Sequence, residues 1–231
     1  MARDGAQVPV AAPASQTLDR GLTILRVVAD SDEPLSIAEI TSAVGLHRSI
    51  TYRMLRTLEE HGLVARDSEN RYRPGVGLAG LARRVAPHLR TAALPHLSSL
   101  ADASRKTAFL VVPDGPDAVT IAVEEPRFSV LHVTYRPGAR HELTRGAPGI
   151  AILAGRPERE SDSARVREAR ARGWAWSTSE VIAGFSACAA PVHDSTGECV
   201  GALSVVYGGE ADLDVLSAQV VSAAQALGAD L

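Results

Sequence analysis

Residues 35–72 constrain the fold more strongly than any other part of the chain. Ser36 and Glu39 have the spacing of a capping box, in which a hydroxyl and a carboxylate satisfy the first free amides of a helix. Gly45 supplies the left-handed residue that commonly ends a helix. A helix of about two turns, followed at once by a second amphipathic stretch, predicts a helix-turn-helix.

The second helix of this motif is predicted over residues 47–61 and has two distinct faces. Helical spacing places apolar side chains on one face and arginines and hydroxyls on the other. The predicted inner face consists of Thr51, Met54, Leu55 and Leu58. The predicted outer face consists of Ser49, Tyr52, Arg53 and Arg56, with Arg48 beside them. A basic outer face is typical of a helix that lies in the DNA major groove.

Two short strands are expected next, at residues 63–66 and 71–73, around a turn at residues 67–70. A strand pair in this position is the wing of a winged helix-turn-helix. We therefore expect the module to bind double-stranded DNA at an operator. The candidate DNA-binding residues are Ser36, His47, Arg48, Ser49, Tyr52, Arg53, Arg56, Arg66, Arg71 and Arg73.

The rest of the chain predicts an α+β architecture around this module. Thr17 is the expected N-cap of a preceding helix, and Pro95 is expected to kink or divide a helix that follows Pro87. Apolar runs and turn residues predict further strands at residues 107–112, 118–123, 129–134, 185–192 and 200–207. Helices are predicted at residues 150–154, 163–172 and 213–227. Antiparallel strands with helices at their ends and faces are typical of a sensor-like domain.

The expected organisation has four parts. They are a disordered tail (1–14), a winged helix-turn-helix domain (15–76), linker helices (77–105) and an effector-binding or dimerisation domain (106–231). Residues 1–90 carry a net charge of +2 and residues 91–231 one of −5, which suits one DNA-facing half. No apolar run is long enough to span a membrane, and two cysteines give no disulfide framework, so we expect a cytoplasmic protein without a membrane partner.

Four segments together resemble the IclR family of bacterial transcriptional regulators. They are TLDRGLTIL, LSIAEITSAVGLHRSITYRMLRTLEEHGLV, GFSACAAPVHDSTGECVGALSVVYG and, more weakly, GAPGIAILAG. The resemblance implies a homodimer or tetramer and a GAF-like C-terminal domain that binds a small organic acid or aromatic metabolite. It implies no enzymatic activity and no cofactor. Carried over to this chain, the effector-binding residues are Ala147, Gly149, Ser177, Ala187 and Ser204.

The chain also departs from the family pattern. Between Pro157 and Val166 this chain has only a few residues, whereas relatives carry a longer helical segment there. The GAF-like domain is therefore expected to be shortened. One alternative is therefore a DNA-binding regulator whose C-terminal domain only oligomerises and binds no ligand. A remote alternative is a thiol enzyme that uses Cys188 or Cys199. The resemblance implies that Ala187 faces the pocket. Because adjacent strand residues face opposite sides, Cys188 is then expected to be a small buried hydrophobic residue.

Other candidate sites are weak in the sequence. His132 and His141 flank an expected turn, but two histidines without a third ligand do not make a metal site. Glu124 and Glu125 are neighbours in an expected strand and point to opposite faces, which rules out a paired carboxylate. We expect neither a catalytic nor a metal site.

Overall fold

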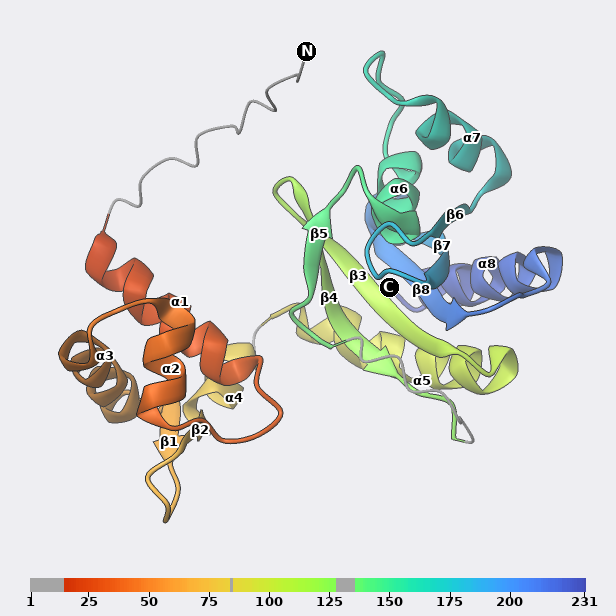
Figure 1. Cartoon of the computed structure of the whole chain (residues 1–231). Coiled ribbons are helices and arrows are strands. Elements are labelled where there is room, and N and C mark those ends of the chain that lie inside the picture. The colour runs from red at the N-terminus through yellow and green to blue at the C-terminus, as the bar shows by residue number, and fades with distance from the viewer. Residues whose placement is uncertain (1–14, 84, 128–135) are drawn as a thin grey trace. The chain divides into compact units, whose positions relative to one another are not determined.

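The computed structural model describes residues 15–83, 85–127 and 136–231. The chain forms two compact units, of which the first ends at Val85 and the second begins at Ala86. Figure 1 shows the elements of both units. The predicted tail at residues 1–14 and the predicted strand at residues 129–134 lie outside the described residues.

The first unit is a three-helix module with a β-hairpin and a short fourth helix. Its elements are α1 (Gln16–Ala29), α2 (Ile37–Val44), α3 (Arg48–Glu60), β1 (Val64–Arg66), β2 (Tyr72–Pro74) and α4 (Gly77–Ala82). The helices and the hairpin enclose one small apolar core, made of Ile24, Val28, Ile40, Leu55, Leu58, Val64 and Tyr72. This is the winged helix-turn-helix that the sequence predicts.

Local signals fix the start and end of α2. The Glu39 N–H donates to Ser36 Oγ at 3.3 Å, and the Ser36 N–H donates to Glu39 Oε2 at 2.7 Å. Gly45 has φ = 62°, so the helix ends in the left-handed conformation as predicted. For α1 the prediction of Thr17 as the N-cap is wrong. Ser15 caps that helix by accepting a hydrogen bond from the Leu18 N–H, which places Thr17 inside the first turn.

The wing contains a third chain segment that the sequence does not reveal. Strands β1 and β2 are antiparallel, and Arg66 pairs with Tyr72 in their register. Leu35 lies on the other side of Tyr72, where the two residues exchange backbone hydrogen bonds of 2.9 and 2.7 Å. The wing is thereby joined to the residues that lead into α2.

The second unit is built on one antiparallel six-stranded sheet with strand order β5-β4-β3-β8-β7-β6. Its strands are β3 (Thr107–Asp114), β4 (Asp117–Glu124), β5 (Arg140–Glu142), β6 (Ala175–Thr178), β7 (Phe185–His193) and β8 (Cys199–Gly208). Strands β5 and β6 form the two edges and were not predicted. Both are short; β5 is polar throughout and β6 combines Ala175 and Trp176 with two polar residues, so neither has the apolar run that predicts the other four strands.

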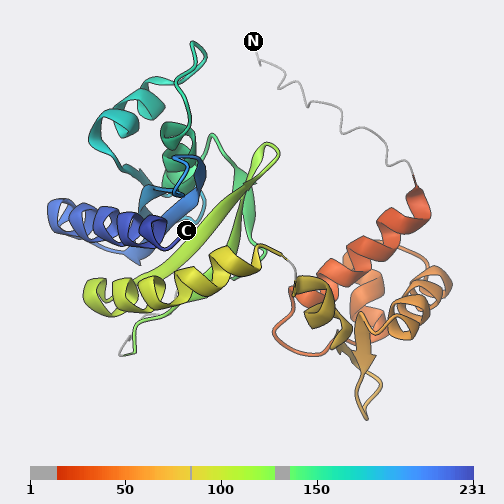
Figure 2. The ribbon, with the colours of Figure 1, turned by 180° about the vertical axis from the view of Figure 1, so that it is seen from behind.

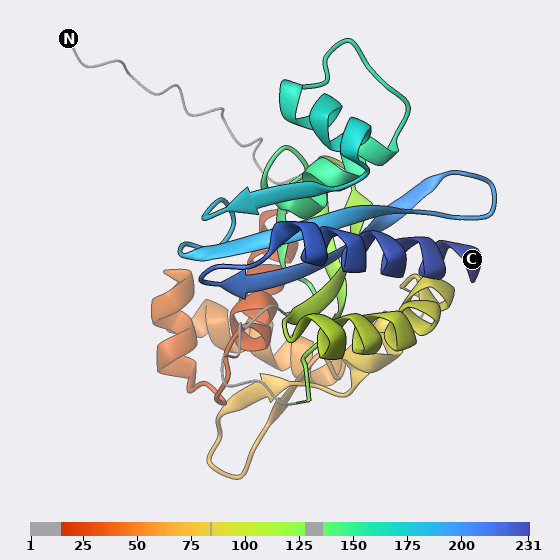
Figure 3. The ribbon, with the colours of Figure 1, turned by 90° about the vertical axis from the view of Figure 1, so that its right-hand side faces the viewer.

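Helices cover both faces of this sheet, as Figures 2 and 3 show. They are α5 (Pro87–Ser104), α6 (Gly146–Gly155), α7 (Ala164–Arg172) and α8 (Leu213–Ala229). Helices α5 and α8 pack on one face and form a core with Leu110, Cys188 and Val205. Helix α6 packs on the other face, against Phe109 and Val206, and α7 packs on α6 and on the edge strand β6.

The expected linker helices are divided between the two units. Helix α4 belongs to the first unit, whereas α5 packs on the sheet of the second. The sequence predicts that Pro95 kinks or divides its helix, and of these two outcomes division is wrong, because α5 is one helix with Pro95 inside it. Ala93, Leu97 and Leu100 are buried against the sheet on either side of Pro95, and this packing stabilises the helix around it.

Candidate nucleic-acid interface and effector pocket

Helix α3 presents its two faces as the sequence predicts. Thr51, Leu55 and Leu58 are buried in the module core, and Met54 is partly buried. On the opposite side Tyr52 and the predicted polar residues are exposed. The N-terminus of α3 receives no side-chain cap, because His47 occupies the N-cap position without a capping hydrogen bond. Its first amides thus add a positive helix end to the exposed face.

The exposed face of α3 and the wing together form an open groove of about 820 Å³. Six of the ten predicted DNA-binding residues line it: His47, Arg48, Ser49, Tyr52, Arg53 and Arg66. Ile37, Asn70 and Tyr72 complete its walls. Ser36, Arg56, Arg71 and Arg73 lie outside it. The groove is therefore lined by most of the residues predicted on α3 to contact DNA, but by only one of the three arginines predicted on the wing, Arg66.

The basic residues of this surface fall into two groups. Arg56 pairs with Glu60 at 3.0 Å, and Arg66 pairs with Glu59 at 3.1 Å while lying over the Tyr72 ring. Glu59 and Glu60 thus each hold one arginine of this surface. In the described parts of the first unit, Arg48, Arg53 and Arg73 make no ion pair. These three exposed guanidinium groups are the ones available to an anionic partner.

Two predicted contact residues have structural partners inside the module. Ser36 uses its hydroxyl to cap α2. Arg71 donates from Nε to the Pro34 carbonyl at 2.7 Å and reaches Glu39 at 3.4 Å, which ties the wing to the start of α2. The Ser36 hydrogen bonds and Arg71 lower the pKa of Glu39, so its carboxylate stays ionised in this cluster. Arg71 therefore acts first as a positioning residue of the wing.

The predicted effector residues lie together on the α6 face of the second unit. Ser177 on β6 pairs in register with Ala187 on β7. Its Oγ accepts a hydrogen bond of 2.8 Å from the Ala147 N–H at the start of α6. Gly149 lies one residue after Pro148 in the same helix, and Ser204 lies on β8 beneath it.

The space between these residues is almost completely filled. The cleft at this position has a volume of about 20 Å³, which is room for one water molecule. Of the five predicted residues only Ser177 and Ala187 line it. Ser204 is fully buried and donates to the Cys188 carbonyl at 3.0 Å. At Gly149 a Cβ atom would lie 2.4 Å from the Leu143 carbonyl oxygen, so only a glycine permits this close packing.

Glu180 lines the same cleft and was not predicted from the sequence. Its carboxylate accepts hydrogen bonds from the Gly146 N–H at 2.9 Å and from Arg165 at 2.7 and 3.1 Å. Burial alone raises the pKa of Glu180, but these hydrogen bonds lower it below the ordinary value. The free amides of the α6 N-terminus are thus occupied by the chain's own carboxylate and by the Ser177 hydroxyl.

The cysteines have the environment of buried core residues. Cys188 lies on the α5–α8 side of the sheet, away from the cleft, and burial raises its pKa to about 12. Burial likewise raises the pKa of Cys199. A nucleophilic thiol needs the opposite shift. His193 is bonded to the Gly155 carbonyl at 2.9 Å and serves to hold the end of α6.

No cluster of three or more His, Cys, Asp or Glu side chains suited to a metal occurs among the described residues, and His132 lies outside them. His141 has its Nδ1 within 3.0 Å of the Glu142 carbonyl. Over the same described residues, no helix combines the length and the apolar character needed to cross a membrane.

Comparison with known proteins matches each unit to a domain of the same protein family. The family model "IclR helix-turn-helix domain" matches residues 17–68, and the model "Bacterial transcriptional regulator IclR C-terminal" matches residues 163–227. The glycerol operon regulatory protein of Streptomyces griseus is 29% identical over 222 residues, with 82% of this chain and 84% of that protein covered. The transcriptional repressor AllR of Klebsiella pneumoniae is 26% identical, with 88% and 84% covered.

Solved structures show the same fold over nearly the whole chain. An IclR homologue from Microbacterium hydrocarbonoxydans, crystallised with 4-hydroxybenzoate, has a TM-score of 0.76 at 19% identity and covers 93% of this chain and 98% of its own. An IclR regulator from Alicyclobacillus acidocaldarius has a TM-score of 0.73 at 23% identity and covers 94% and 97%. With both units matched in order, the chain belongs to the IclR family of bacterial transcriptional regulators.

Proposed function

We propose that this transcriptional regulator contacts its operator through the groove between α3 and the wing. The observation that carries the proposal is the exposed guanidinium groups of Arg48 and Arg53 beside the uncapped start of α3. Arginine forms bidentate hydrogen bonds with guanine in the major groove and with backbone phosphate. Arg73 on β2 extends the basic surface toward the neighbouring phosphates.

The test is a fluorescence anisotropy titration with the DNA upstream of the protein's own gene, with a shuffled fragment of equal length as control. We expect tighter binding to the upstream DNA and a steep loss of affinity as salt rises, because each phosphate contact releases counterions. Equal, weak binding to both fragments at low salt contradicts the proposal.

The first unit also has the surface expected of a homodimer. Leu18 and Leu22 of α1 are 62% and 47% exposed, and Leu81 of α4 is 67% exposed. Apolar side chains of this size on the helices of one module favour burial against a second copy. Sedimentation of the full chain is expected to give a dimer or tetramer, and a Leu18→Glu/Leu22→Glu variant is expected to dissociate more readily. A monomeric wild-type chain refutes this part.

The second unit is proposed to respond to a small organic acid. A structural neighbour of the same fold is crystallised with 4-hydroxybenzoate, and the α6 N-terminus here already binds a carboxylate, that of Glu180. A ligand at 100 times its Kd stabilises the protein by about 2.7 kcal/mol, which a thermal shift assay detects readily. If no organic acid in a broad panel shifts the melting temperature, the second unit only oligomerises, which is the competing proposal.

The thiol-enzyme alternative receives no support from the site. The pKa of Cys188 is about 12, and its side chain packs among Leu110 and Val205. A Cys188→Ala/Cys199→Ala variant is expected to bind DNA as the wild type does.

A further inference from the structure

A second cavity lies between α6 and α7, apart from the cleft that the sequence predicts. Its volume is about 360 Å³, against about 20 Å³ for the cleft between the sheet and α6. The larger value lies within the range of small-molecule pockets, near its lower end. Ile150, Leu153 and Val166 supply apolar side chains to its walls.

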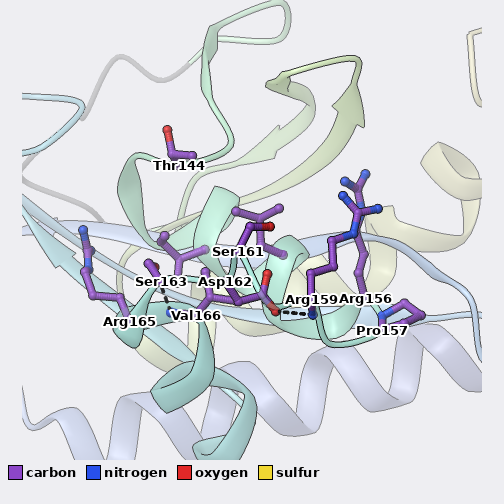
Figure 4. A pocket seen from close by; sticks show the side chains of 11 residues that line it. Thr144, Arg156, Pro157, Arg159, Ser161, Asp162, Ser163, Arg165 and Val166 are labelled. Atoms are coloured by element: carbon purple, nitrogen blue, oxygen red, sulfur yellow. Dashed lines mark hydrogen bonds between the residues drawn. The ribbon is translucent and has the colours of Figure 1, made fainter.

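The rim of this cavity is cationic. Figure 4 shows Arg156 and Arg159 on the loop after α6, with Arg165 on the other side of the cavity. Arg165 is engaged by Glu180 at 2.7 Å. Arg156 and Arg159 make no ion pair within the parts of the chain that the structure describes. Two guanidinium groups are therefore available above an apolar floor.

The one acidic side chain in the lining is already neutralised. Asp162 accepts from the Arg159 N–H at 3.0 Å and pairs with Arg170 at 2.8 Å, and the first of these bonds contributes most to lowering its pKa. Glu158 and Glu160 are exposed and do not line the cavity. The cavity thus keeps a positive field at its rim.

Arg170 also holds the walls of the cavity in place. Its guanidinium donates to the carbonyls of Leu153, Ala154 and Arg156 at 3.1–3.2 Å, in addition to the Asp162 carboxylate. The end of α6 and the loop that follows are thereby fixed to α7. A site whose walls are already ordered loses less conformational entropy when a ligand binds.

We propose that the α6–α7 cavity binds a small organic anion with an apolar body, such as an aromatic monocarboxylate. The carboxylate is held by Arg156 and Arg159, and the apolar body packs against Ile150, Leu153 and Val166. A neutral molecule leaves both guanidinium groups without a partner, and an inorganic anion leaves the apolar floor in water. Only the effect of this ligand on operator affinity rests on the proposed function, since binding is measurable without DNA.

The test is isothermal titration of the full chain with three probes: benzoate, its neutral analogue benzamide, and inorganic phosphate. We expect benzoate to bind at least about tenfold more tightly than either of the others, because only benzoate satisfies both the rim and the floor. No detectable benzoate binding overturns the proposal, and so does equal affinity for benzamide or phosphate.

Variants locate the site. Arg156→Gln/Arg159→Gln is expected to weaken benzoate binding by about tenfold or more, whereas Arg90→Gln, an exposed arginine on α5, is expected to leave it unchanged. Val206→Ile adds one methylene group to the wall of the 20 Å³ cleft and is expected to have no effect. The single Arg159→Gln variant repeats the test if the double variant unfolds.

The proposal is overturned if Val206→Ile loses benzoate binding while Arg156→Gln/Arg159→Gln retains it. That result would assign the ligand to the cleft. Operator binding without benzoate is measured for every variant and is expected to match the wild type. A failure of the cavity proposal is thereby distinguished from a failure of DNA binding.

Discussion

Arg71 and Arg73 lie two residues apart at the wing, yet the structure gives them different roles. The Arg71 guanidinium is bonded to the Pro34 carbonyl and the Glu39 carboxylate, whereas Arg73 is exposed on β2. Replacing each with methionine keeps the unbranched stem and removes the charge. We expect Arg71→Met to lower stability and Arg73→Met to lower DNA affinity.

The magnitude for Arg71 follows from its two contacts. A hydrogen bond from a charged group contributes about 1.5–3 kcal/mol, and the Nε bond to Pro34 belongs at the lower end because the Arg71 side chain is 39% exposed. The 3.4 Å contact with the exposed Glu39 adds only a few tenths of a kcal/mol. Arg71→Met is therefore expected to destabilise the first unit by about 1.5–2 kcal/mol.

Two measurements separate the roles. Urea unfolding is expected to show a lower midpoint for Arg71→Met and an unchanged one for Arg73→Met. In salt titrations of operator binding, Arg73→Met is expected to reduce the slope of log K against log salt by about 0.9, the value for one lost phosphate contact, while Arg71→Met preserves it. An unchanged urea midpoint together with a reduced salt slope for Arg71→Met refutes the positioning role.

Three further changes test other parts of the structure. Arg53→Ala is expected to weaken specific binding by about 1–3 kcal/mol in anisotropy titrations without changing stability, and Arg56→Ala, whose guanidinium is paired with Glu60, to weaken it less. Leu55→Asp buries an unpaired charge in the module core and is expected to abolish operator binding and unfold the first unit, seen as a lost cooperative transition. The pKa of Glu180 is lowered in the folded state, so its ionised carboxylate stabilises the protein at pH values above the ordinary pKa of about 4.3. This stabilisation is lost as the pH falls through the folded-state pKa. Urea midpoints measured against pH are expected to show the loss in the wild type and not in Glu180→Gln.

The fold of the first unit was predictable because its signals are local. Ser36, Glu39 and Gly45 lie within ten residues of one another, and each acts on the helix that it borders. The pairing of Leu35 with Tyr72 was not predictable in the same way. It joins residues far apart in the sequence through backbone atoms, which leave no mark in the residue types.

In the candidate sites, too, features set by local sequence were predictable and features set by long-range contacts were not. Helical periodicity predicts the outer face of α3. Strand alternation places Ala187 and Cys188 on opposite faces of β7, and only the family resemblance indicates which of the two faces the cleft. The partners of Arg71, Pro34 and Glu39, lie more than thirty residues away in the sequence, so the engagement of this arginine became visible only in the structure. The closure of the effector cleft likewise depends on the loop that carries Glu180, whose neighbour Ser179 adopts a positive φ of 55° that its residue type does not predict.

Selection of bound DNA from a random library tests the central claim most directly. The full chain is expected to enrich one sequence motif, arranged as an inverted repeat whose half-sites are about one helical turn apart or a multiple of it, as for a symmetric dimer. Arg48→Ala/Arg53→Ala is expected to lose that enrichment while remaining folded. A library that stays random after repeated selection with the wild-type chain contradicts the account.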